Sequence, residues 1–208
     1  MRRLSSVFVV TGAVLAAVLG GGAGAANASA TIDLIWADTG TNEMSNLELS
    51  AAITLQVILT TGPNGSQGAG ISVDYSSVLS TLAVVGYMST PGGGLPLILG
   101  STSDTGSRIE NVNSASFPPY VGTGLTAAGQ THQLGTVTFQ ASQLPSGTLE
   151  IWTDADGPTD DVLDFNGNLI TSTTAFNSAF LCAGGGPCPI VTASPTATAT
   201  STPTPTPT

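Results

Sequence analysis

The chain has 208 residues and carries 13 acidic side chains against three basic ones, which gives a formal net charge of −10 at neutral pH. Proteins that bind nucleic acid or anionic lipid need clusters of lysine and arginine, and this sequence contains no lysine at all. We therefore exclude nucleic acid as a partner and interpret the acidity as a source of solubility outside the cell.

The chain begins like an exported protein. Two arginines follow the first methionine and precede an apolar run over residues 7–19, after which small residues provide two Ala-x-Ala sites. This pattern is typical of a secretory signal peptide, and the run is shorter than the ~20 residues that span a bilayer. We expect residues 1–30 to be the signal peptide, with a mature start at Ser29 or Thr31. The mature domain is then secreted or at the cell surface, without membrane insertion.

Period-two alternation dominates the region that follows. From Leu47 to Leu59 the odd positions are apolar and most even ones are polar, which predicts a strand with one buried face. Shorter runs of the same kind recur, separated by glycine, proline and asparagine. The predicted strands are 32–36, 47–60, 70–75, 82–88, 95–99, 108–113, 135–141, 148–153, 162–165 and 169–173.

These elements indicate the fold class. No internal stretch keeps a helical period, and the Asn166-Gly167 pair predicts a tight hairpin whose two central residues both have positive φ. We predict an all-β fold, a jelly-roll-like β-sandwich of two sheets with about nine strands, over residues 31–190.

The order of these segments resembles the first half of a cohesin domain. The corner from Tyr75 to Leu79, which reads Tyr-Ser-Ser-Val-Leu, is similar to the Tyr-Asp-Pro-Ser-Val-Leu corner of cohesins but is one residue shorter. The later run from Leu134 to Phe139 resembles a cohesin core strand. The resemblance implies a binding module that holds a dockerin through one sheet face, in extracellular assemblies directed at polysaccharide. A sandwich like those of carbohydrate-binding modules stays open.

The densest acidic segment suggests a metal site. Asp154, Asp156, Asp160 and Asp161 surround a glycine turn, and calcium is bound by several such oxygens. The spacing does not follow the EF-hand rule, because proline stands at the third ligand position. We predict a structural calcium ion held by these four residues, and the alternative is a solvated loop rich in turn residues.

Aromatic side chains suggest a sugar-binding alternative. Trp152 alternates with Leu149 and Ile151, which predicts that it points away from the core, and Tyr87 and Tyr120 lie near loops. Such rings can stack on sugars. The competing interpretation places both tryptophans in the core.

Two cysteines, Cys182 and Cys188, lie near the end of the predicted domain. In an exported chain we expect them to form a disulfide, and a metal site is the alternative. Catalysis has little support, because the single histidine, His132, has no recognisable partner motif, and carboxylates such as Glu110 and Glu150 pair in any acidic sandwich. We expect a protein that is not an enzyme and that has no cofactor other than calcium.

The chain closes with a segment of unusual composition. Residues 193–208 contain only alanine, serine, proline and threonine. Such a tract cannot form a core and behaves as an extended spacer. We predict that residues 191–208 are a Pro/Thr-rich linker that leads to a further domain or anchor, or a free stalk.

Overall fold

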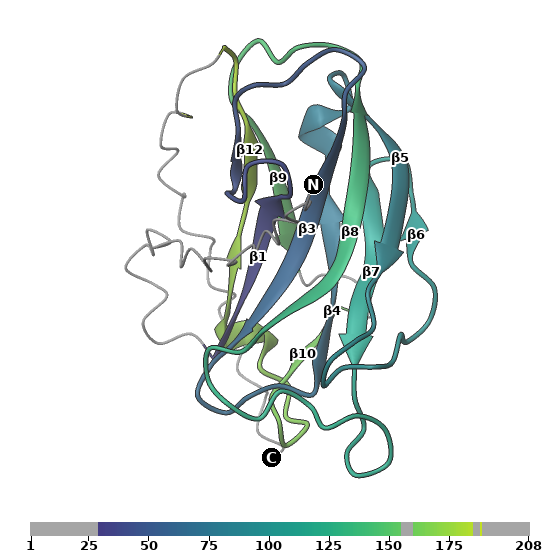
Figure 1. The fold of residues 1–208 in the computed structure, drawn as a ribbon, viewed down its shortest axis with the longest axis vertical. Coiled ribbons are helices and arrows are strands. Elements are labelled where there is room, and N and C mark those ends of the chain that lie inside the picture. Colours follow the sequence, from purple (N-terminus) through teal and green to yellow (C-terminus); the bar gives the residue numbers. More distant parts are fainter. Residues whose placement is uncertain (1–28, 155–159, 185–187, 189–208) are drawn as a thin grey trace, which may run out of the picture.

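Two β-sheets pack face to face in the computed structural model, which describes residues 29–154, 160–184 and 188. Figure 1 shows β3 and β8 in the nearer layer and β4 in the farther one. The strands are β1 (Ala30–Trp36), β2 (Glu43–Met44), β3 (Ala52–Thr61), β4 (Gly68–Asp74), β5 (Leu82–Ser89), β6 (Ser103–Asp104), β7 (Arg108–Ala115), β8 (Thr131–Ala141), β9 (Leu149–Asp154), β10 (Val162–Leu163), β11 (Thr174–Asn177) and β12 (Ala179–Leu181). The predicted all-β sandwich is confirmed.

The first sheet has five strands in the order β11-β1-β3-β8-β5. All neighbours in it are antiparallel except β1 and β11, which run parallel. The alternation that the sequence shows in β3 is preserved, since every second residue from Ile53 to Thr61 is buried. The five-stranded sheet therefore turns one face to the core and the other to solvent.

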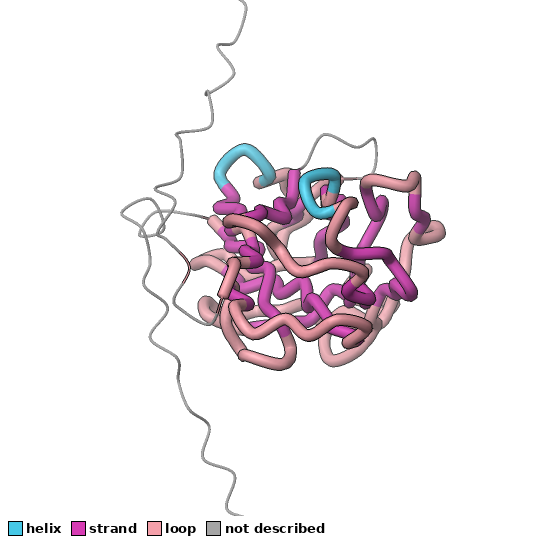
Figure 2. The backbone as a smooth tube through the Cα atoms, turned by 90° about the horizontal axis from the view of Figure 1, so that it is seen from above, coloured by secondary structure: helices cyan, strands magenta, loops and turns pink. Residues whose placement is uncertain are grey.

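The second sheet has the order β2-β12-β9-β4-β7-β6, and β10 also pairs with β4. With β10 included, we call it the seven-stranded sheet. β9 and β10 both lie along β4, one beside Ser72–Asp74 and the other beside Gly68–Ala69. Short 3-10 turns at Ser76–Val78 and Thr171–Thr173 are the helical segments of the described chain, drawn in cyan in Figure 2.

Large side chains from both sheets fill the space between them. Phe139 of β8 is fully buried and meets Trp36 of β1 edge-to-face at 6.2 Å between ring centroids. Tyr75, which follows β4, meets the same ring at 5.8 Å. Edge-to-face aromatic pairs of this kind stabilise beyond their buried area. The corner after β4, which carries the resemblance to cohesins, therefore places a ring in the core.

Glycine at position 135 lets β8 lie close both to its neighbour β5 and to β7 of the other sheet. A Cβ on Gly135 of β8 would lie 2.3 Å from the carbonyl oxygen of Met88 and 2.5 Å from a methyl of Val112 on β7. Contacts that short cannot exist, so a side chain at this position would force the strands apart.

The long strand predicted from Leu47 begins five positions later than expected. Leu49 is 59% exposed, although its odd position suggested burial. Ser50 has a positive φ of 64°, which breaks the extended backbone before β3 starts at Ala52. The alternation before Ala52 therefore belongs to a turn, and the predicted start was wrong.

The C-terminal part also differs from the predicted strands. Gly167 has a positive φ of 80°, but Asn166 is not among the residues with positive φ, so the predicted turn type was wrong. The turn is closed instead by the backbone N–H of Asp164, which donates to Asn168 O at 2.9 Å. Residues 171–173 form a 3-10 turn rather than a strand, and residues 95–99 make only isolated bridges. Strands β11 and β12 were missed.

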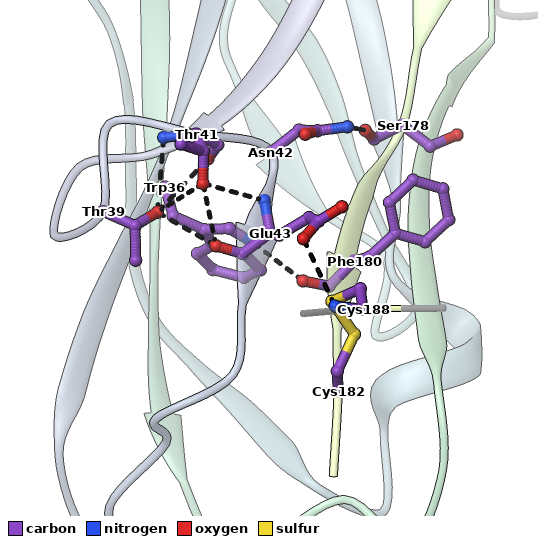
Figure 3. Close-up of a disulfide and its surroundings, with 9 residues drawn as sticks. All are labelled: Trp36, Thr39, Thr41, Asn42, Glu43, Ser178, Phe180, Cys182 and Cys188. Atoms are coloured by element: carbon purple, nitrogen blue, oxygen red, sulfur yellow. Dashed lines mark hydrogen bonds between the residues drawn. A yellow bond between two sulfur atoms is a disulfide. The ribbon is translucent and has the colours of Figure 1, made fainter. Parts of the chain in front are cut away.

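The predicted disulfide between Cys182 and Cys188 is present, with 5.4 Å between the Cα atoms. Cys182 directly follows β12, and its N–H donates to Met44 O at 2.9 Å. The N–H of Cys188 donates to Glu43 Oε2 at 3.3 Å, as Figure 3 shows. The bond therefore fastens the end of β12 beside β2. No helix in the described residues is long and apolar enough to cross a membrane.

Reduction of this disulfide is expected to loosen the C-terminal edge without unfolding the sandwich. The bond closes a short loop, with a sequence separation of 6. Its loss should cost about 2 kcal/mol of unfolding free energy. Urea unfolding of a Cys182→Ser, Cys188→Ser double variant measures this cost. A global loss of structure in that variant would contradict the expectation, as would alkylation of both thiols without reductant.

Candidate functional site

The outward face of the seven-stranded sheet carries a row of polar and aromatic side chains. Asp74 of β4 lies opposite Trp152 of β9 on one side and opposite Arg108 of β7 on the other. Val73 and Ile151, which alternate with Asp74 and Trp152, are fully buried in the core. Strand alternation therefore turns Asp74 and Trp152 outward, and both are partly exposed. We call the outward side of β12, β9, β4 and β7 the partner face.

A second row extends the partner face across β2, β12 and β9. Phe180 lies between Glu43 and Glu150 in the strand register. In Figure 3 its ring points away from Trp36, whose indole N–H donates to the backbone oxygen of Phe180 at 3.2 Å. Phe180, flanked by two carboxylates, gives this end of the face both apolar area and negative charge.

A groove of about 240 Å³ lies on the same side of the sheet. Gly68 and Gly70 of β4 contribute to its lining without side chains, while Leu99 and Leu163 contribute apolar surface. The amide of Asn113 holds one side in place, because its Oδ1 accepts the N–H of Leu99 at 2.7 Å. The groove is therefore a mainly apolar hollow, and the side-chain amide of Asn113 fixes the backbone of Leu99 at its edge.

The segment Asp160–Asp161, just before β10, lies against β4. Asp160 is buried, and its Oδ2 accepts hydrogen bonds from Ser72 Oγ at 2.6 Å and from Arg108 Nη2 at 3.2 Å. The backbone oxygen of Asp161 accepts the N–H of Gly70 at 2.8 Å. An ion pair between partly and fully buried side chains fixes this segment against the sheet.

Asp164 organises the next turn. Its Oδ1 accepts the backbone N–H groups of Asn166 and Asn168, each at 2.8 Å, and its Oδ2 accepts the side-chain amide of Asn168 at 2.9 Å. The hydrogen bonds from Asn168, and then those from Asn166 and Gly167, lower the pKa of this carboxyl below its usual value. The carboxylate of Asp164 therefore stabilises the turn that follows it.

The four predicted calcium ligands do not share one environment in the structure. Asp160 faces Ser72 and Arg108, Asp161 is exposed, Asp154 ends β9, and Asp156 lies outside the described residues. Among the residues that the structure describes, no group of three or more His, Cys, Asp or Glu side chains is placed to hold a metal. The calcium site stays a prediction.

Calcium is expected to raise the melting temperature if the acidic segment binds it. Binding to the folded state alone adds about 2.7 kcal/mol at a hundredfold excess over the dissociation constant. Melting curves with calcium, with chelator and with Asp156→Ala test this, and Asp38→Ala on an exposed turn is the matched control. Equal midpoints for the unmutated protein with calcium and with chelator would leave only a solvated loop.

The predicted sugar-binding aromatics do not form one surface. Trp152 lies on the partner face, Tyr87 lies on β5 of the other sheet, and Tyr120 lies in the loop after β7 with 89% of its surface exposed. The tryptophan is placed as predicted, while Trp36 is in the core. The sequence interpretation missed Asp74, Arg108, Phe180 and the groove, although Arg108 is the one basic residue after the predicted signal peptide.

His132 has a structural environment. Its Nε2 lies 3.1 Å from both Thr90 O and Ser114 Oγ. Burial lowers the pKa of the imidazole, although the hydrogen bond with Thr90 acts in the opposite direction. Ser114 is fully buried and donates its own hydroxyl to Leu95 O. The contacts of His132 with Thr90 and Ser114 therefore join the loop after β5 to β7 and β8.

No protein-family model and no curated protein sequence matches the chain significantly. Solved structures do match. A non-cellulosomal cohesin from the archaeon Archaeoglobus fulgidus superposes with a TM-score of 0.51 and 15% identity, over 76% of this chain and 93% of that one. The fold is that of cohesin modules. At such low identity the likeness concerns the fold alone.

Two further cohesins have the same degree of similarity. The third cohesin of ScaC from Acetivibrio cellulolyticus, solved in complex with the ScaB dockerin, has a TM-score of 0.50 and 10% identity, over 75% of this chain and 99% of that one. The cohesin CaCohA2 from Clostridium acetobutylicum has a TM-score of 0.50 and 14% identity, over 77% and 94%. The resemblance seen in the sequence is thus confirmed as a cohesin-like sandwich.

Proposed function

We propose that this protein is a non-catalytic, cohesin-like module that holds a dockerin-like protein on its partner face. The observation that carries the proposal is a sheet face with the partly exposed Trp152 in a polar row and an adjoining apolar groove, on a fold shared with a cohesin solved in complex with a dockerin. Interfaces of this kind use aromatic and arginine side chains as anchors and polar groups around them.

A pull-down tests this function. The mature domain is immobilised and exposed to dockerin-like modules encoded in the same genome, with an unrelated calcium-binding domain as the control. Saturable binding of one dockerin-like module supports the proposal. Absence of binding to every such module overturns it.

A carbohydrate-binding or purely structural surface role is the second candidate, because Trp152 exposes part of its ring on a sheet face. Sugars stack on such rings. Retention of the domain on insoluble polysaccharide, lost on washing with soluble oligosaccharide, would favour this candidate. The two assays use different ligands, so each candidate can fail alone.

The proposed site of action is outside the cell, in an assembly directed at polysaccharide. The structure helps to choose between the two predicted cleavage sites. Ala30 is buried in β1 and pairs with Thr61 and Thr174, and the N–H of Ser29 donates to Thr173 O at 2.9 Å. Cleavage before Ser29 preserves these contacts, whereas cleavage before Thr31 removes them.

The secreted protein is therefore expected to begin at Ser29. N-terminal sequencing of material from the culture medium measures the start directly. A start at Thr31 would show that the pairs of Ala30 are dispensable. Recovery of intact Met1 in a membrane fraction would contradict the signal peptide itself.

A further inference from the structure

The loop between β3 and β4 carries an Asn-x-Ser sequence, formed by Asn64, Gly65 and Ser66. Asparagine two positions before a serine or threonine, with any residue except proline between them, is the acceptor sequence for N-linked glycans in exported proteins. The same pattern at Asn27 lies in the predicted signal peptide and outside the described residues, and cleavage before Ser29 removes it. Asn64 is therefore the one such acceptor in the predicted mature chain.

The side chain of Asn64 is exposed, as is that of Pro63 before it. Within the described part of the chain the Asn64 amide has no hydrogen bond. Its backbone is fixed, because Asn64 O accepts the N–H of Phe165 at 3.2 Å. Figure 1 shows this loop at the end of the sandwich where β10 lies. A glycan on the amide would extend into solvent and would displace no contact of the described residues.

Ser66 of the same sequence faces the interior. It is fully buried, and its hydroxyl donates to Leu163 O at 2.8 Å and accepts the N–H of Gly68 at 2.9 Å. Its own N–H and C=O pair with Leu125, at 2.7 Å in each direction. Gly65 is held as closely, since a Cβ there would overlap Leu125 O. In the folded domain the amide therefore points to solvent and the hydroxyl to the interior.

This orientation determines when a glycan can be attached. An enzyme that recognises the acceptor sequence must contact both the amide that it modifies and the hydroxyl two residues later. Leu163, whose carbonyl oxygen accepts that hydroxyl, comes 97 residues after Ser66 in the chain. The hydroxyl is thus accessible until β10 has paired with β4. Attachment must precede folding.

We propose that Asn64 carries an N-linked oligosaccharide, added to the unfolded chain during export. In this reaction Asn64 Nδ2 forms a bond to C1 of the first sugar of an oligosaccharide carried on a lipid pyrophosphate. The bond between that carbon and the phosphate oxygen breaks, and the lipid pyrophosphate leaves. A base of the oligosaccharide transferase takes the amide proton.

The glycan depends on the proposed export but not on partner binding. Asn64 precedes the start of β4 at Gly68, whereas Asp74, which lies opposite Trp152, is at the other end of this strand. The two ends are about 20 Å apart, since a strand rises ~3.3 Å per residue. The row of the partner face that contains Trp152 therefore stays uncovered.

Mass spectrometry of the protein secreted by its native cells tests the proposal. We expect a proteolytic peptide that contains Asn64 to carry a mass increment of whole sugar residues. The stretch from Asn166 to Asn168 is an internal control, because its Asn-Gly pair is also exposed but no hydroxyl follows. Secreted protein with an unmodified Asn64 overturns the glycan and leaves the export intact. A chain retained inside the cell overturns both, and equal modification of Asn166 overturns the assignment to the acceptor sequence.

A matched pair of variants locates the glycan. Asn64→Gln removes the acceptor and should abolish the mass increment. Asn46→Gln is the control, because Asn46 is also exposed but is followed by leucine and glutamate. Melting curves establish that both variants are folded. Loss of the increment in both variants, or in neither, overturns the assignment to Asn64.

The order of attachment and folding has a separate test. The folded protein without glycan and a synthetic peptide of residues 60–68 are offered to the same oligosaccharide transferase with its lipid-linked donor. The peptide should be modified and the folded protein should not, because burial of Ser66 hides the hydroxyl. Modification of the folded protein at the rate of the peptide would overturn the proposed order. A peptide that is not modified would overturn the acceptor site itself.

Discussion

Replacing Phe139 with alanine is expected to lower the free energy of unfolding by about 4 kcal/mol, the largest effect of any single change considered for this fold. The ring is fully buried between the sheets. It contacts Trp36 and Tyr75 edge-to-face, at 6.2 and 5.8 Å between centroids. The substitution removes both aromatic contacts and leaves a cavity that the rigid sheets cannot close.

Urea unfolding monitored by tryptophan fluorescence measures this loss. The matched control is Phe117→Ala, because Phe117 lies in a loop with 47% of its surface exposed. Its substitution should change the unfolding free energy by no more than about 0.5 kcal/mol. Similar losses for the two variants would mean that Phe139 is not central to the core.

Trp152→Ala is expected to weaken binding of the protein partner by about thirtyfold, equivalent to ~2 kcal/mol. Trp152 is the largest partly exposed side chain on the partner face, and it lies in one row with Asp74 and Arg108. Tryptophan at the centre of an interface commonly dominates the binding energy. The stability of the variant should change little, since the ring lies outside the core.

Isothermal titration with the dockerin-like module found by pull-down gives the affinity. Tyr87→Ala is the control, because Tyr87 is an exposed aromatic residue of the other sheet. Unchanged affinity in Trp152→Ala would remove this face as the binding site. Loss of polysaccharide retention in the same variant, with no protein ligand, would support the sugar-binding candidate instead.

The strands that sequence reasoning located are those whose pattern is set by the core. From Ala52 to Thr61 burial alternates residue by residue, because one face of β3 covers the sandwich interior. β2 and β6 have two residues each, too few to show a period. β11 and β12 were missed because their pairing depends on β1 and β9, which are distant in the sequence.

The same distinction applies to the candidate site. Trp152 could be placed on the outward side of its strand because alternation decides the side of a strand on which a residue lies. Asp160 could not be placed, because its ion-pair partner Arg108 is 52 residues away in the sequence. The spacing in the sequence suggested a cluster of carboxylates. In the fold, one of them, Asp160, faces Arg108, the one arginine of the domain.

The last strands of the domain complete both sheets. β11 pairs with β1, β12 pairs with β2 and β9, and the indole of Trp36 binds the backbone of Phe180 across 144 residues of sequence. A nascent chain that has not yet been synthesised to Leu181 therefore leaves the edges of β1 and β9 open. Such long-range pairing is slow to form, and open edges favour aggregation. Folding of this domain is thus expected to follow its synthesis, and a chain that ends before Thr174 should fail to close either sheet.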